Sequence, residues 1–184
     1  MSEITKKALG EALKKLSMKK ELSKITIKNI TDYCGVNRQT FYYHFKDIYD
    51  LIEWIYINDV IKELKDNNSY ESWSNGLLFI FKYILENKNF VINIYNSDGK
   101  DYLMNFLYTK TSQSIIRVIE QKTENVEITA ENKKFIANFY KYAFVGIIKE
   151  WIENGMKEKP ENIINKLNLM LKTSFEEAIE SLKN

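Results

Sequence analysis

Residues 26–45 read TIKNITDYCGVNRQTFYYHF, and this stretch decides the fold of the first part of the chain. Thr26 is a residue type that caps helix starts. Gly35 predicts the end of the first helix, with a positive φ at that position. Asn37 then predicts a second start, so the pattern indicates two short helices joined by a tight turn.

Two short helices joined by a glycine-containing turn of three to four residues form a helix-turn-helix. In this motif the first helix braces across the DNA backbone, and the second places its N-terminal residues in the major groove. Apolar side chains must hold the two helices together. The spacing predicts a shared core of Ile30, Cys34, Val36, Phe41 and Phe45.

The other positions of the second helix, about 38–44, are predicted to be exposed. Arg38 can read guanine and Gln39 can read adenine through paired hydrogen bonds. Thr40 offers a methyl group to thymine and a hydroxyl group to a base or a phosphate. The side chains able to donate to phosphates are Tyr42, Tyr43, His44 and Lys46.

The distribution of charge supports a basic head. Residues 1–47 hold ten Lys or Arg and five Asp or Glu, a net charge of +5, whereas residues 48–184 hold seventeen against twenty, a net charge of −3. This asymmetry favours contact between the head and a polyanion, although ordinary solvated helix faces would also explain it. Lysine is abundant throughout, so a single lysine carries little weight.

The composition excludes several classes of protein. Six Gly and one Pro are too few for an all-β chain, and no glycine-rich phosphate loop is present. One Cys and one His exclude a disulfide framework and a zinc finger, and no nucleophile–base set can be assembled. The start lacks an apolar leader, and the most apolar stretch, residues 135–148, is too short to cross a bilayer. We therefore expect a cytoplasmic protein that is not an enzyme and needs no metal or cofactor.

Apolar periodicity predicts an all-α chain of about nine helices with no strand. Asp47 is a further predicted cap, and Asn154-Gly155 is a predicted helix end. The expected helices cover residues 4–19, 26–34, 38–44, 48–64, 70–88, 90–96, 100–122, 131–154 and 160–182.

Residues 25–51, ITIKNITDYCGVNRQTFYYHFKDIYDL, resemble the N-terminal DNA-binding domain of TetR-family transcription regulators. The resemblance extends over about residues 4–64, and TFYYHFKD at 40–47 is its most specific part. It implies a head of residues 1–47, with the family-type domain reaching about 64. It also implies a helical body of residues 48–184 that binds a small effector and forms a homodimer on palindromic double-stranded DNA.

The resemblance also implies roles for single residues. Thr26 and Lys28 would touch phosphates at the start of the bracing helix. Small residues are usual in the family where Thr31 and Tyr33 stand, so Tyr33 must tilt outward or displace a neighbour. The stretch WIENGMKEKPENIINKL at 151–167 resembles, weakly, the branch of dihydroxyacetone-kinase regulators.

Aromatic residues gather in the middle of the chain. They could line an apolar cavity for an effector or fill an ordinary core, and the sequence leaves both interpretations open. The residues predicted for the pocket are Trp73, Phe81, Tyr95, Tyr102 and Phe106.

The helix over 131–154 is apolar nearly all round, so it must be covered on two sides. One cover would be its own domain and the other a symmetry mate, with Gly146 allowing close approach; a central helix of a monomer is the alternative. The predicted dimer interface is Tyr140, Phe144, Ile147, Ile148, Trp151, Leu167, Leu171 and Phe175.

The sequence thus predicts a homodimeric, sequence-specific DNA-binding regulator, a repressor released by a small molecule of unknown identity. The alternative is a TetR-like co-regulator that acts through a protein partner. His44 is interpreted as a phosphate contact or surface residue and not as a metal ligand. Cys34 is interpreted as a buried small apolar residue and not as a redox sensor.

Overall fold

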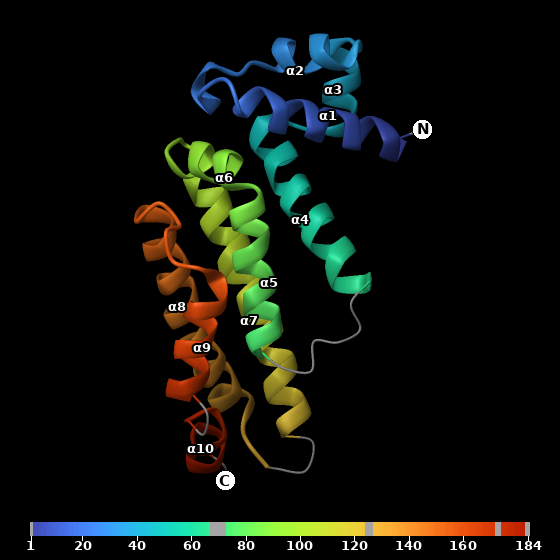
Figure 1. The fold of residues 1–184 in the computed structure, drawn as a ribbon. Coiled ribbons are helices and arrows are strands. Elements are labelled where there is room, and N and C mark those ends of the chain that lie inside the picture. Colours follow the sequence, from blue (N-terminus) through green and yellow to red (C-terminus); the bar gives the residue numbers. More distant parts are fainter. Residues whose placement is uncertain (1, 67–72, 124–126, 172–173, 183–184) are drawn as a thin grey trace. The chain divides into compact units, whose positions relative to one another are not determined.

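The computed structural model describes residues 2–66, 73–123, 127–171 and 174–182, and the side chains at 2, 60–66, 73 and 175–176 lie outside this description. Within the described ranges there are ten α-helices, one 3-10 helix (η1) and no strand (Figure 1), which confirms the predicted all-α fold. The helices are α1 (Ser2–Ser17), η1 (Leu22–Lys24), α2 (Ile27–Cys34), α3 (Arg38–His44), α4 (Ile48–Asp66), α5 (Trp73–Glu86), α6 (Lys88–Tyr95), α7 (Lys100–Lys122), α8 (Ala130–Glu153), α9 (Pro160–Leu171) and α10 (Ser174–Ser181).

The ten helices of the described ranges agree with the prediction of about nine. The helix expected over residues 160–182 corresponds to α9 and α10, and residues 172–173, which stand between them in the sequence, lie outside the described part of the chain.

The chain forms two compact units. The first unit consists of residues 1–66 and 87–106, and the second consists of residues 67–86 and 107–184. Helix α7 therefore contributes its first part, up to Phe106, to the first unit and its remainder to the second. The functional division predicted above, into a head of 1–47 and a body of 48–184, stays a prediction.

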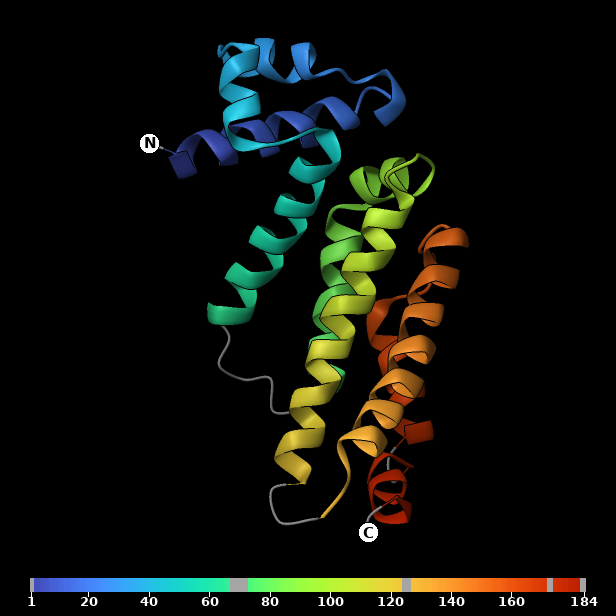
Figure 2. The same cartoon turned by 180° about the vertical axis from the view of Figure 1, so that it is seen from behind.

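In the first unit, α1 lies against α2 and α3 and also packs on α4 and α6 (Figures 1 and 2). The side chains of Leu9 and Leu13 on α1 are completely buried, as is Ile30 on α2. Leu51 on α4 completes this apolar centre. The core of the first unit is therefore built around one face of α1.

In the second unit, α5 packs against α9, and α10 packs on α8 and α9 (Figure 2). Phe81 of α5 meets Trp151 of α8 edge to face, with ring centres 4.9 Å apart. Helix α8 ends where the sequence predicted, because the amide of Met156 donates to the carbonyl of Trp151 at 2.8 Å and Gly155 has a φ of 76°. None of the described helices is both long and apolar enough to cross a bilayer.

Gly35 offers a direct test of the turn between α2 and α3. Its φ of 66° lies in the left-handed region, and a Cβ there would meet no atom within 4 Å. Strain alone should therefore make Gly35→Ala lower the free energy of unfolding by about 1–2 kcal/mol. Gly35→Asn should lower it less, since Asn tolerates this conformation. Urea unfolding followed by circular dichroism measures both, and an alanine variant as stable as the wild type would contradict the argument.

Candidate nucleic-acid interface

Helix α2 is fixed by caps at both ends. The amide of Asn29 donates to Thr26 Oγ1 at 3.2 Å, and the amide of Thr26 donates back to Asn29 Oδ1 at 3.1 Å. This reciprocal pair is a capping box. At the other end, Gly35 takes the left-handed conformation and the amide of Val36 donates to the carbonyl of Thr31 at 3.0 Å. The predicted start and stop of the first helix are confirmed.

Helix α3 is short, with seven residues, and one apolar side chain anchors it. Asn37 caps the helix, since its Oδ1 accepts from the amide of Thr40 at 2.8 Å and from the Thr40 hydroxyl at 3.0 Å. Phe41 is completely buried and lies 5.8 Å from the ring of Phe45, which is also buried. Because Phe41 is the only buried residue of α3, the opposite face of the helix is turned outward.

The outward face of α3 carries the residues predicted to read DNA. Arg38 and Gln39 are exposed, and Tyr42 and Tyr43 expose 59% and 82% of their surface. Thr40 is half-buried because its hydroxyl group is bound to Asn37. The remaining predicted contacts are placed at the surface (Thr26, Lys28, Lys46) or half-buried beside Tyr43 (His44).

The core beneath this face is smaller than predicted. Ile30, Phe41 and Phe45 are buried, but Cys34 and Val36 are only half-buried because they flank Gly35, where the backbone leaves the helix. The Cys34 thiol donates to the carbonyl of Ala8 at 3.3 Å, and its burial raises the pKa of the thiol above its usual range. A raised pKa disfavours the reactive thiolate, in agreement with a packing role.

Thr31 and Tyr33 depart from the family pattern, and the structure shows where their side chains lie. Thr31 is buried, and its hydroxyl donates to the carbonyls of Ile27 and Lys28 at 3.0 and 3.2 Å. Tyr33 exposes 59% of its surface, which confirms that it tilts outward. The fold therefore accommodates both side chains without displacing the core residues.

The chain leaves α3 through a third capped start. The amide of Asp50 donates to Asp47 Oδ1 at 2.9 Å, which confirms the predicted cap of α4, and the amide of Lys46 donates to Asp50 Oδ2 at 2.8 Å. Tyr49 follows in the first turn of α4. Partial burial, together with the nearby Asp98, Tyr102 and Asp47, raises the pKa of its hydroxyl.

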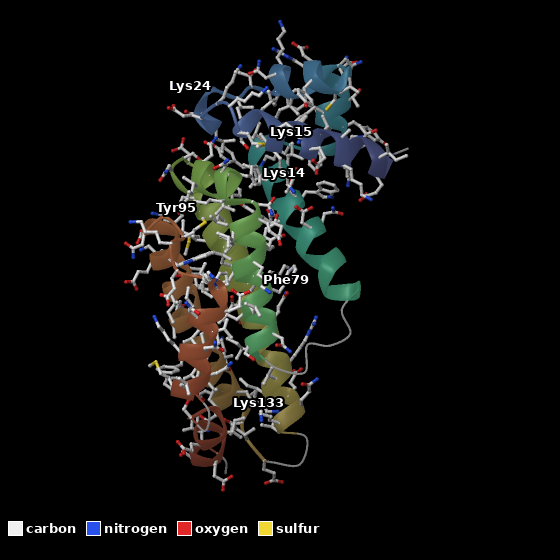
Figure 3. The ribbon with its side chains drawn as sticks, in the orientation of Figure 1. Lys14, Lys15, Lys24, Phe79, Tyr95 and Lys133 are labelled. Atoms are coloured by element: carbon white, nitrogen blue, oxygen red, sulfur yellow. The ribbon has the colours of Figure 1, made fainter. Side chains whose placement is uncertain are left out.

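The charges of the head fall into two groups. Lys14 and Lys24 form ion pairs with Asp59 and Glu21, and Figure 3 labels both lysines, Lys14 on α1 and Lys24 on η1. Among the side chains that the structure describes, no carboxylate forms an ion pair with Arg38, Lys28 or Lys46. Arg38, Lys28 and Lys46, the second group, therefore keep their positive charges available for an external anion.

The residues predicted for an effector pocket are dispersed. Phe81 is buried against Trp151 in the second unit, whereas Tyr95 and Phe106 are buried in the first unit. Tyr102 is 38% exposed and stacks on Tyr49. The Trp73 side chain lies outside the described residues. The choice between a pocket and a filled core stays open.

Most of the predicted dimer residues are buried within a single protomer. Tyr140, Phe144, Ile148, Trp151 and Leu167 expose 6% of their surface or less, Ile147 and Leu171 are half-buried, and the Phe175 side chain lies outside the described residues. The predicted interface did not include the large apolar side chains that α8 and α9 do expose. These are Phe135, Phe139, Tyr142, Leu169 and Met170, with exposed fractions of 66%, 62%, 60%, 80% and 75%.

Comparison with known proteins finds a family match in the second half of the chain and a relative over nearly all of it. Residues 71–173 match the TetR family described as "Transcriptional regulator C-terminal region". The HTH-type dhaKLM operon transcriptional activator DhaS of Lactococcus lactis is 29% identical over 175 residues, which cover 93% of this chain and 92% of that protein.

Solved structures give the same result. The dihydroxyacetone kinase operon activator DhaS superimposes with a TM-score of 0.74 at 27% identity and covers 98% of this chain and 99% of its own. NalD of Pseudomonas aeruginosa, the secondary repressor of the MexAB-OprM efflux pump, shares the fold at 14% identity, with a TM-score of 0.62 over 91% of this chain and 94% of its own. The chain belongs to the TetR family of transcription regulators, as its helix-turn-helix sequence indicated.

Proposed function

We propose that this regulator is a homodimer that binds a palindromic double-stranded operator through α3. The observation that carries the proposal is the geometry of α3, which is capped by Asn37, anchored by the buried Phe41 and open on its other face. A helix held in this way presents its N-terminal side chains to the major groove at a low entropic cost.

The exposed residue types suit distinct parts of DNA. Arg38 and Gln39 stand at the N-terminal end of α3, where the guanidinium group matches guanine and the amide matches adenine. Thr40 and Tyr42 would face bases or adjacent phosphates. The residues proposed to hold the backbone are Thr26, Lys28, Tyr43, His44 and Lys46.

Replacement of Arg38 tests the direct reading of bases. Arg38→Ala should weaken binding to the specific operator by about 1–3 kcal/mol and relax the preference at one base position, since a bidentate pair with guanine is lost. Fluorescence anisotropy with an operator fragment and a scrambled fragment measures both effects. Arg117→Ala is the matched control, because Arg117 is the other arginine of the chain and lies exposed on α7. Equal operator affinity of the two variants would reject the role of Arg38.

The exposed face of α8 and α9 supports the proposal of a homodimer. Phe135, Phe139 and Tyr142 recur at helical spacing, and Gly146 continues their line with no atom within 4 Å of its Cβ position. Met170 of α9 lies at the edge of two hollows, one lined by Ile147 and the other by Phe135 and Phe139. Large exposed apolar faces of this kind mark association surfaces, and a two-fold axis would place each Met170 against the other protomer.

A charge on this face should separate the protomers. Phe139→Glu removes about 1.5–3 kcal/mol of apolar burial in each copy, about 3–6 kcal/mol for the dimer, so the dissociation constant should rise by at least about a hundredfold. Because Phe139 is exposed in the protomer, the helical content should stay unchanged. Sedimentation velocity over a dilution series measures the shift. Gln121→Glu, which adds a charge at an exposed position of α7, is the control, and a dimer of unchanged affinity would contradict the assignment.

The direction of regulation has two candidates. The sequence predicted a repressor released by a small-molecule effector, whereas the relative that is 29% identical is named an activator. That name favours activation, and the alternative of a co-regulator that acts through a protein partner is a separate candidate. In a reporter strain, deletion of the gene should raise transcription from the bound promoter for a repressor and lower it for an activator. Promoter binding by the purified protein that requires an added partner would identify the co-regulator.

A further inference from the structure

One side chain of α6 holds the connection between α1 and η1 by three hydrogen bonds. Asn93 Oδ1 accepts from the amide of Leu22 at 2.7 Å, and Asn93 Nδ2 donates to the carbonyls of Ser17 and Lys20 at 2.9 and 2.6 Å. The bonded residues lie 71 to 76 positions earlier in the sequence. A single amide therefore links two distant parts of the first unit.

The three backbone groups lie where α1 gives way to η1. Ser17 is the last residue of α1, so its carbonyl has no amide further along the helix, and Lys20 lies in the turn between α1 and η1. Leu22 is the first residue of η1, so its amide has no acceptor within that helix. An asparagine amide is suited to this place because it offers one acceptor and two donors. Asn93 thus fixes the end of one helix to the start of the next.

This connection leads directly into the helix-turn-helix. Leu22, the first residue of η1, and Ile25, which directly follows η1, are both buried, and Thr26 then caps α2. The Leu22 side chain also packs close to the turn after α6, because a Cβ added at Gly99 would lie 3.4 Å from Leu22 Cδ2. The position of η1 therefore sets where the bracing helix begins.

The segment over residues 87–106, which contains α6 and the first part of α7, also contacts the other end of the helix-turn-helix. Tyr102 of α7 stacks on Tyr49 with ring centres 5.0 Å apart and planes 9° apart. One turn further, Phe106 stacks on Tyr56, also at 5.0 Å. Tyr49 and Tyr56 belong to α4, which begins four residues after α3 ends. Residues 87–106, which we call the clasp, thereby contact the chain before α2 and after α3.

We propose that Asn93 is a positioning residue for operator binding, which it serves by holding the α1–η1 connection within the clasp. The inference rests on the proposed function, because it assigns to Asn93 a part in presenting α2 and α3 to DNA. Asn93 itself touches no DNA in this scheme. Its loss should leave the helices intact and make the head less preorganised, so affinity should fall while the fold persists.

Two substitutions of Asn93 separate its donor and acceptor groups. Asn93→Ala removes all three hydrogen bonds, whereas Asn93→Asp keeps the acceptor for Leu22 and removes both donated hydrogens. Operator binding should weaken about tenfold for the alanine variant and at least as much for the aspartate variant, because its carboxylate would face the carbonyl oxygens of Ser17 and Lys20 without a hydrogen between them. Asn89→Ala, at an exposed position one turn earlier on α6, should bind as the wild type does. Binding is measured below the temperature at which circular dichroism detects unfolding, so that lost stability alone leaves the affinity unchanged.

A second readout needs no DNA. The amide of Leu22 should exchange slowly with solvent in the wild type and in Asn93→Asp, and rapidly in Asn93→Ala. Should the alanine variant fail to fold, Asn93→Asp and the wild-type exchange rate still decide. Rapid exchange of Leu22 in the wild type, or a folded alanine variant with operator affinity within twofold of the wild type, would overturn the role of Asn93. A wild-type protein that binds no promoter DNA but protects Leu22 would instead refute the proposed function.

Discussion

The burial of Phe41 is the contact on which the presentation of α3 depends. A helix of seven residues is too short to persist in water by its own hydrogen bonds, so its stability must come from packing. Phe41 is the one side chain of α3 that is sealed in the core shared by α1, α2 and α3. Its position in the helix decides which face is left over. Gln39 and Tyr43, each two residues from Phe41, therefore turn outward, and Arg38 is exposed at the first position of the helix.

In such short helices, most backbone amides and carbonyls lie near an end, where they have no partner within the helix. This explains why three helix starts in so short a segment carry a capping side chain. Thr26, Asn37 and Asp47 each accept a backbone amide three residues ahead, at 3.2, 2.8 and 2.9 Å. Each cap of this kind contributes about 1 kcal/mol. Together with the left-handed Gly35, they fix where α2 begins and ends and where α3 and α4 begin. The angle between α2 and α3 then follows from a few local bonds.

These local devices are also why the head could be predicted from the sequence. Caps, glycine turns and apolar spacing depend on residues within about four positions of one another. The helix starts at Thr26, Asn37 and Asp47 and the helix end at Gly35 could therefore be predicted from the local sequence. Asn93 could not be found in this way, because its partners lie more than seventy positions away and asparagine is common in this sequence. In the body, the sequence could not show which side chains of α8 face outward, for a related reason. The apolar residues around α8 show that it is covered on several sides, but only the packing of α5, α9 and α10 decides that Tyr140 and Trp151 face inward while Phe139 and Tyr142 face outward.

The composition of the head separates affinity from specificity. Lysines supply a diffuse positive charge that attracts any nucleic acid and weakens with added salt, because each phosphate contact releases counterions. Twenty-five lysines in the chain make this contribution insensitive to any one of them, and Lys14 and Lys24 are partly neutralised by Asp59 and Glu21. Arginine is used only twice, and one copy stands at the first position of α3. A planar guanidinium group can match two acceptors of guanine at once, which an ammonium group cannot do with the same geometry. Under the proposed function, the discrimination among sequences is therefore concentrated in Arg38 and Gln39, while the strength of binding is spread over the lysines of the two proposed protomers.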